Sequence, residues 1–245
     1  MAEKRIEITE DQLLDFIRCP VRYDSIYNAK FIPQGQPSLS FYLKKIENAF
    51  FAMLMDGQAP SMDFLKRRWD QICEENPDYL TPQKCIEGIG QIAKLYRWAE
   101  RQELMIADMN SMYRLEFRSG SLLVILSGRM GTVAFSKKRE PYLLEIDFSN
   151  RMPIQPMMDM KLIYTIHCKA AFEMYGKKFG IKMHYVKLNK DLYTMRNESD
   201  FGRLAATVIN VAKSRELGLY YPRESVFCTT CDMLNFCKVW RATYA

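Results

Sequence analysis

Four of the seven cysteines are placed where they could hold a metal centre. Cys228, Cys231 and Cys237 form a C-x2-C-x5-C pattern near the C-terminus. Two thiolates three residues apart in a turn can bind one centre, and a third thiolate supplies most of the remaining coordination. Cys19 is the candidate fourth ligand, because it precedes Pro20 where an expected helix ends. Sites made of four thiolates bind zinc as well as iron–sulfur clusters, so both metals remain open.

A centre that binds both Cys19 and Cys228 would join residues 209 positions apart in the chain. In the chain-entropy model, closing so long a loop removes about 4–5 kcal/mol of conformational freedom from the unfolded state. That is a large share of the stability of a typical domain. We therefore expect a structural tie rather than a redox centre, because ligation alone does not establish electron transfer.

The remaining cysteines and the chain's composition favour a cytoplasmic protein. The N-terminal residues are charged and lack the apolar stretch of a signal peptide. No apolar run reaches the roughly 18 residues that a membrane helix needs, so we expect no membrane part. Disulfides are rare in a reducing compartment. Cys73, Cys85 and Cys168 are therefore predicted to be free thiols that pack in the core.

The sequence pattern predicts a mixed-sheet α/β fold in a single domain. It divides into a helical N-terminal region (1–110), an α/β core (111–219) and a cysteine-rich tail (220–245). Apolar spacing and capping residues predict helices at Thr9–Ile17, Leu39–Met55, Ser61–Glu75, Thr81–Met109, Met157–Gly176 and Ser199–Leu217. Alternating or continuous apolar runs predict strands at Met112–Arg118, Leu122–Leu126, Met130–Phe135, Tyr142–Phe148 and Lys182–Leu188.

The segment around Cys19 resembles a known motif. Leu13–Tyr23 follows the order leucine, aromatic, Cys-Pro, basic, aromatic, which opens the iron–sulfur nucleases of the PD-(D/E)XK (restriction-endonuclease-like) superfamily. These include the AddB subunit of bacterial recombination helicase–nucleases and the CRISPR adaptation exonucleases. The cysteine tail and the order of elements are also similar to theirs. The resemblance implies a RecB-type nuclease fold and a 4Fe–4S cluster bound by Cys19, Cys228, Cys231 and Cys237.

The catalytic positions implied by this resemblance are altered. Such nucleases use an Asp, an Asp or Glu, and a Lys; the carboxylates hold Mg²⁺ or Mn²⁺, and the Lys supports transition-state charge. Here Gly131 stands in place of the Asp, Glu145 matches the second acid, and Asp147 replaces the Lys. Glu47 falls where some members carry a metal-binding His. Tyr164 keeps the Tyr of a Q-x-x-x-Y motif that has lost its Gln.

These substitutions indicate a degenerate site, because Gly131 has no ligating side chain and Asp147 cannot supply positive charge. The alternative is an active DNA exonuclease that binds Mg²⁺ or Mn²⁺ through Glu47, Glu145 and Asp147. The two histidines, His167 and His184, are expected to be structural.

Basic residues suggest contacts with nucleic acid. The chain has 35 Lys and Arg against 29 Asp and Glu, a net charge of +6, which suits a nucleic-acid binder without requiring one. Lys137, Lys138 and Arg139, in a hairpin loop expected beside the degenerate site, and Arg129 are the candidates for contacting a DNA backbone. A solvated loop is the alternative for this run.

Together these features predict an iron–sulfur protein of nuclease fold without catalytic activity. It would bind DNA, including single-stranded DNA, or a protein partner in a replication, recombination or transcription assembly. An active metal-dependent exonuclease and a zinc-stapled protein-interaction module are the two alternatives. Visible absorbance, digestion of labelled DNA and salt-dependent binding separate them.

Overall fold

The computed structural model describes residues 3–32, 36–137, 139–234 and 237. The chain falls into two compact units that interleave in sequence. The first unit comprises residues 1–35, 112–129 and 198–245, and the second comprises residues 36–111 and 130–197. Both units contain helices and a mixed sheet, so the predicted mixed α/β class is confirmed.

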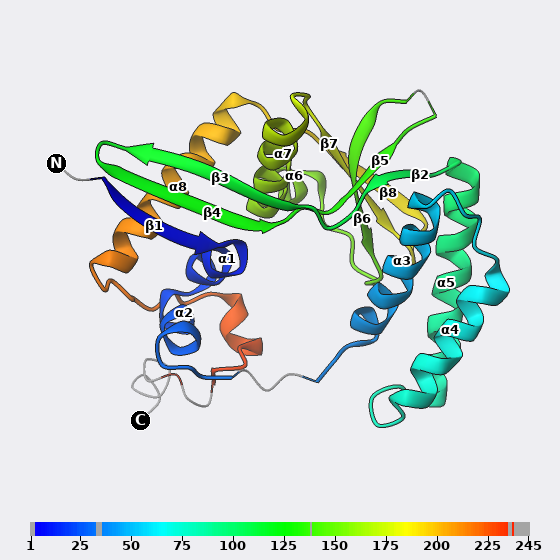
Figure 1. Ribbon diagram of the computed structural model, residues 1–245. Coiled ribbons are helices and arrows are strands. Elements are labelled where there is room, and N and C mark those ends of the chain that lie inside the picture. The colour runs from blue at the N-terminus through cyan, green and yellow to red at the C-terminus, as the bar shows by residue number, and fades with distance from the viewer. Residues whose placement is uncertain (1–2, 33–35, 138, 235–236, 238–245) are drawn as a thin grey trace. The chain divides into compact units, whose positions relative to one another are not determined.

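The first unit is built on a three-stranded sheet (Figure 1). β1 (Lys4–Thr9) runs parallel to β4 (Leu122–Arg129), and β3 (Met112–Ser119) pairs antiparallel on the other side of β4. Gly120 makes the tight β3–β4 turn with a φ of +59°, which costs glycine little. The prediction of a helical region from the first residue is wrong for β1. In this strand, buried and exposed side chains alternate, and Ile6 and Ile8 are the buried ones.

Three helices and one short 3-10 turn complete the first unit. The capping box predicted at Thr9 and Gln12 is confirmed, because each side chain accepts a hydrogen bond from the other residue's backbone N–H. The elements are α1 (Glu10–Arg18), α2 (Pro20–Tyr27), α8 (Glu198–Glu216) and the 3-10 turn η1 (Val226–Thr230).

The second unit contains a five-stranded sheet in the order β2-β5-β6-β7-β8. β6 is its middle strand, as its near-continuous apolar sequence predicted, and only its pairing with β7 is parallel. The strand predicted at Met130–Phe135 does not continue the preceding hairpin, because it pairs in this second sheet. The strands are β2 (Met105–Asp108), β5 (Thr132–Phe135), β6 (Pro141–Asp147), β7 (Gly180–Tyr185) and β8 (Lys190–Thr194).

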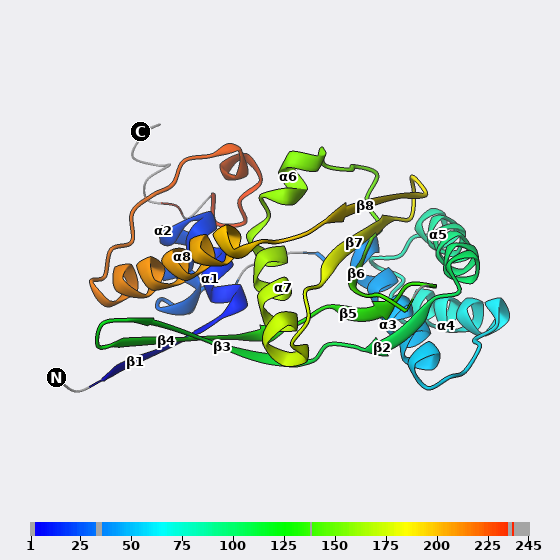
Figure 2. The same ribbon diagram turned by 90° about the horizontal axis from the view of Figure 1, so that it is seen from above.

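Helices cover both faces of this sheet (Figure 2). Alternate residues of β7 face opposite sides: His184 stacks on Trp98 of α5, and Met183 accepts a hydrogen bond from Tyr164 of α7. The helices on the Trp98 side are α3 (Leu39–Met55), α4 (Met62–Glu75) and α5 (Pro82–Gln102), and those on the other side are α6 (Gln155–Asp159) and α7 (Leu162–Tyr175).

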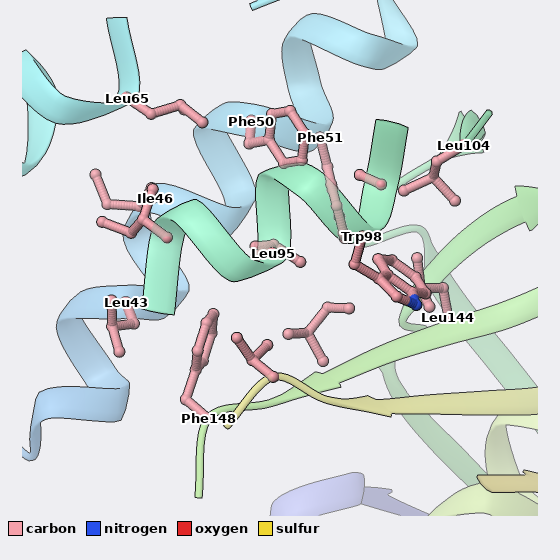
Figure 3. Close-up of a cluster of buried hydrophobic side chains, with 14 of the residues drawn as sticks. Leu43, Ile46, Phe50, Phe51, Leu65, Leu95, Trp98, Leu104, Leu144 and Phe148 are labelled. Carbon is pink, nitrogen blue, oxygen red and sulfur yellow. The ribbon is translucent and has the colours of Figure 1, made fainter. Parts of the chain in front are cut away.

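The core of the second unit lies between the sheet and helices α3, α4 and α5. Apolar side chains of all three helices meet the even-numbered residues of β6 there, and Trp98 is buried as predicted. Figure 3 shows this packing for Leu43, Ile46, Phe50, Phe51, Leu65, Leu95, Trp98, Leu104, Leu144 and Phe148. Because side chains alternate along a strand, Glu145 lies on the opposite face of β6 from Leu144 and Ile146.

Two predicted helices are too long. The one predicted at Thr81–Met109 ends at Gln102, because Glu103 takes a left-handed conformation and β2 follows. The one predicted at Met157–Gly176 is broken into α6 and α7 at residues 160–161, and Gly176 ends α7 with a φ of +64°. An apolar pattern continues across both breaks, which is why the pattern alone missed them.

A disulfide in the second unit contradicts part of the cysteine prediction. Cys73 and Cys85 are bonded to each other, with Cα atoms 6.2 Å apart. Helices α4 and α5 follow one another through a short loop, so the end of one lies beside the start of the other. Trp69 reinforces the contact by donating a hydrogen bond to the Cys85 carbonyl at 2.9 Å. Cys168 is buried and not disulfide-bonded, as predicted, and its thiol donates a hydrogen bond to the Phe179 carbonyl at 3.4 Å.

Two glycines of α5 give a matched test of this helix packing. A Cβ added at Gly88 would clash with the indole ring of Trp69, whereas one added at Gly90 would meet no atom. Gly90→Ala is expected to stabilise the protein by up to about 1 kcal/mol, because alanine favours helix. Gly88→Ala is expected to destabilise it by about 1–3 kcal/mol through overpacking. Urea unfolding measures both; two changes of the same sign would contradict the packing described.

No helix among the described residues is long and apolar enough to cross a membrane.

Candidate metal centre and degenerate nuclease site

The four candidate cysteines line one cavity in the first unit. Cys19, Cys228, Cys231 and Cys237 all border a cavity of about 430 Å³. Cys19 sits at the junction of two helices, where its N–H donates to the Asp15 carbonyl at the end of α1 and Pro20 begins α2. Cys19 therefore belongs to neither helix: it has an extended backbone and lies at the turn between α1 and α2.

Successive tight turns place the other three cysteines. Cys228 N–H donates to Ser225 O, Cys231 N–H to Cys228 O, and Cys237 N–H to Leu234 O, at 2.9, 3.2 and 3.4 Å. Each bond spans three residues. Cys228 lies in the 3-10 turn η1, and Cys231 directly follows that turn with an extended backbone.

Protein contacts also connect the two cysteine segments. The Arg22 guanidinium donates to both carboxylate oxygens of Asp232, at 3.0 and 3.1 Å, and also contacts Asp15. The hydrogen bond from Arg22 holds the pKa of Asp232 below its usual value. Asp15 is further held by the Tyr27 hydroxyl, at 3.0 Å. This network fixes Asp232, and with it the adjacent Cys231, against α2.

The donor set fits a thiolate-bound metal centre. Four cysteine sulfurs are the ligands of both structural zinc and 4Fe–4S clusters. Among the described residues, no three His, Cys, Asp or Glu side chains are grouped as ligands of a single metal ion. The ligands of a four-iron cluster bind different iron atoms, so they are spread more widely than the ligands of one ion.

The residues expected at a nuclease site come together in the second unit. Gly131 precedes β5 and lies against the Glu145 side chain of β6: a Cβ at position 131 would clash with Glu145 Oε1. The carboxylate of Glu145 thus borders the space that a side chain at 131 would occupy. Asp147 lies on the same face of β6 two residues on, where its Oδ1 accepts a hydrogen bond from Ser149 N–H at 2.6 Å.

Glu47 approaches the same region from α3. Its side chain is only 6% exposed, and Lys44, one helical turn earlier, donates a hydrogen bond to its Oε1 at 3.0 Å and lies 2.9 Å from its Oε2. Burial raises the pKa of Glu47 to about 7, against the opposing effect of the Lys44 charge; the neighbouring charge of Glu145 adds to the increase. Two carboxylates from a helix and a strand therefore share one environment.

Glu145 is stabilised in its charged form. Burial alone would raise the pKa of Glu145, but the hydrogen bond from His167 and the charges of Lys44 and Lys161 outweigh it and lower the pKa. His167 Nδ1 lies 3.6 Å from Glu145 Oε1. The Glu145 carboxylate, which matches the nuclease motif, therefore stays ionised. Cationic and hydrogen-bonding groups of the protein balance its negative charge.

Tyr164 contributes to the wall of this region. It is buried in α7, and its hydroxyl donates to the sulfur of Met183 at 3.9 Å. Burial, with the nearby charge of Glu145, raises its pKa. The ammonium of Lys161 lies 5.2 Å from the centre of the Tyr164 ring. Tyr164 is therefore a neutral packing residue beside the acids.

Sequence reasoning missed two members of this group, Lys44 and His167. His167 was expected to be merely structural, yet it contacts Glu145. A signal was present: Tyr164 and His167 are three residues apart in one helix and so share a face. Lys44 precedes Glu47 by the same spacing. His184 is structural as expected, because it is buried and hydrogen-bonded to Asp191 at 2.7 Å.

The pKa of Glu47 leads to a test by pH. Its folded value of about 7 exceeds its ordinary value of 4.5, so the folded state holds this proton more tightly than the unfolded state. The corresponding stability is fully present below pH 4.5 and is lost as pH rises through 7. It amounts to at most about 3 kcal/mol. The urea midpoint of the wild type minus that of Glu47→Gln should decrease as pH rises from 4.5 through 7. A difference that does not change with pH would contradict the assignment.

The basic residues are placed differently from the expectation. Lys137 and Arg139 do lie in the β5–β6 hairpin, and both are exposed, with Lys137 paired to Glu103 at 2.7 Å. The β5–β6 turn follows Phe135, whereas Gly131 lies at the other end of β5. At the usual rise per strand residue, Phe135 and Gly131 are about 13 Å apart. The hairpin is therefore not beside the degenerate site. Arg129 is exposed at the end of β4, and Lys138 lies outside the described residues.

Comparisons with known proteins bear on the fold. No protein-family model matches the chain, and no curated protein matches it. The alignment with the crystal structure of SSO0001 has 12% sequence identity and a TM-score of 0.45, and it covers 98% of this chain and 89% of that chain. The alignment with the crystal structure of a protein named "Putative exonuclease" from Eubacterium rectale has 10% sequence identity and a TM-score of 0.56, and it covers 96% of this chain and 87% of that chain. The second similarity shows a shared fold across nearly the whole chain.

Proposed function

We propose that this chain is an iron–sulfur protein of PD-(D/E)XK nuclease fold that binds DNA without hydrolysing it. The observation that carries the proposal is the convergence of Cys19 with the three tail cysteines on one cavity. The fold shared with a protein named as an exonuclease supports the nuclease-fold part. At 10% identity that similarity bears on fold, so the activity is argued from the site.

A 4Fe–4S cluster on Cys19, Cys228, Cys231 and Cys237 would act as a structural tie. When bound, the cluster supplies four covalent links between the α1–α2 junction and the tail. The Arg22–Asp232 pair orients the two segments toward each other from one side. Zinc is the competing occupant of such a donor set, and it would give the same tie without visible colour.

The absence of hydrolysis is argued from three positions. Gly131 provides no metal ligand, and Asp147 provides no positive charge where a lysine would support the transition state. Glu145, the remaining matching acid, is held by His167 and acted on by Lys44. A site with these groups binds and positions a phosphate poorly, so the proposal assigns binding rather than catalysis.

DNA binding rests on charge. The net charge of +6 and the exposed basic hairpin favour contacts to phosphates, which are largely independent of sequence. The hairpin's distance from the acidic site implies that it contacts the DNA backbone and does not present a scissile bond to Glu145.

A mobility-shift series with labelled single-stranded DNA at increasing salt tests this binding. We expect a shift at low salt that weakens steeply as salt rises. Lys137→Ala/Arg139→Ala should reduce the slope of log affinity against log salt by about 2. Lys177→Ala/Lys178→Ala removes the same charge from exposed positions elsewhere and should leave the slope nearly unchanged. No shift at low salt would exclude DNA and favour a protein partner.

A further inference from the structure

Lys44 makes an unusual contact for a partly exposed lysine. Its ammonium donates a hydrogen bond to Oε1 of Glu47 at 3.0 Å and lies 2.9 Å from Oε2, so the positive charge is close to both oxygens of one carboxylate. The Glu47 side chain is 6% exposed, whereas that of Lys44 is 42% exposed. The ammonium therefore reaches a buried carboxylate from the solvent side.

The same lysine serves a second acid. Its positive charge acts on Glu145 of β6 as well as on Glu47 of α3, and the two carboxylates repel each other. Two neighbouring carboxylates need a cation or a proton between them, because like charges at short range disfavour joint ionisation. Lys44 supplies one positive charge to the pair, and His167 contacts Glu145 as well.

We propose that the Lys44 ammonium occupies the cation position at the Glu47 carboxylate, in the neighbourhood of Glu145, and closes it to divalent metal ions. This inference rests on the proposed function, since it gives a physical reason for a nuclease fold without metal-dependent chemistry. The positive charge that strand β6 lacks at Asp147 is thus present on α3 instead, where it binds the acids rather than a substrate phosphate.

An ordinary ion pair between residues one helical turn apart is the competing explanation. Such pairs on helix surfaces contribute about 0.3–0.5 kcal/mol and have no bearing on metal affinity. The burial of Glu47 and the presence of Glu145 distinguish this pair. The two explanations differ in one measurable property: only a lysine that occupies a cation position should, on removal, create affinity for a metal ion.

Lys44→Met is the direct test, because methionine keeps the chain length and removes the charge. Relative to the wild type, this variant should bind Mn²⁺ at least about tenfold more tightly, since a unit charge next to the acids is removed. Bound Mn²⁺ is measured by loss of the free-ion signal in electron paramagnetic resonance, and by the rise in melting temperature at millimolar Mn²⁺. The wild type should show neither effect.

Two further variants isolate the cause. Lys45→Met removes the adjacent charge, which lies over the rings of Phe41 and Tyr42 and not on a carboxylate; it should gain no Mn²⁺ affinity. Lys44→Met/Glu47→Gln removes the lysine together with its buried acid. This double variant should lose the Mn²⁺ affinity gained by Lys44→Met and regain much of its stability.

Every outcome decides the inference. Mn²⁺ binding by the wild type as tight as by Lys44→Met would overturn it, as would a folded Lys44→Met that binds no Mn²⁺. If Lys44→Met does not fold alone, it is refolded with and without Mn²⁺: recovery with Mn²⁺ supports the inference, and no recovery contradicts it. None of these readouts measures DNA hydrolysis, so failure here is distinguishable from failure of the proposed function, which a nuclease assay reports.

Discussion

Cys19→Ala is expected to lower the free energy of unfolding by about 4–5 kcal/mol. Cys19 is the only proposed cluster ligand from the N-terminal part of the chain, so its loss releases the tail from the α1–α2 junction. Residues 19 and 228 are 209 positions apart, and the unfolded chain regains the freedom that this tie removes. Other contacts between the two segments remain, including Arg22 with Asp232 and Arg223 with the Ile17 carbonyl, but they form only in the folded state and do not restrict the unfolded chain.

Thermal and urea unfolding without oxygen measure this effect, with Cys231→Ala as a second variant that should also destabilise the fold. Cys168→Ala is the matched control, because Cys168 is a buried cysteine of the second unit that is not disulfide-bonded and does not line the cavity. It should cost about 1 kcal/mol, as typical single substitutions do. An unchanged melting temperature in Cys19→Ala or Cys231→Ala would refute the tie.

Wild-type protein incubated with labelled single-stranded DNA and Mg²⁺ or Mn²⁺ is expected to leave the DNA intact. Removing one preorganised electrostatic group from an enzyme site slows catalysis by about 10²–10³. Here the ligand expected at Gly131 and the cation expected at Asp147 are both missing. Their combined loss should bring hydrolysis to the level measured without protein.

Glu145→Ala is the control for the nuclease assay. Because Glu145 is assigned no catalytic role, this variant should give the same intact DNA as the wild type. Digestion by the wild type that disappears in Glu145→Ala would contradict the assignment. It would favour a metal-dependent exonuclease that works through Glu47, Glu145 and Asp147.

The sequence predicted those parts of the fold that local patterns encode. The capping box at Thr9 and the helix Leu39–Met55 were predicted correctly, because side-chain caps and apolar spacing are local signals. Strand β1 and the assignment of β4 and β5 to different sheets were missed. Both depend on which distant strand is the partner: β1 pairs with residues more than a hundred positions away.

The candidate sites divide in the same way. The tail spacing and the Cys19-Pro20 pair predicted four cysteines that border one cavity together with other residues, and their binding of a metal stays a prediction. The group around Glu145 could be predicted only in part. His167 contacts an acid on another element, which the sequence cannot show, whereas the contact of Lys44 with Glu47 follows from helical spacing but the burial of Glu47 does not.

The iron and zinc content of protein purified without oxygen tests the central claim most directly. A 4Fe–4S cluster on the four cysteines predicts about four irons per chain, broad visible absorbance and no zinc. Cys19→Ala prepared in parallel should contain less iron, whereas Cys168→Ala should match the wild type. One zinc per chain in place of iron, or neither metal, would contradict the account.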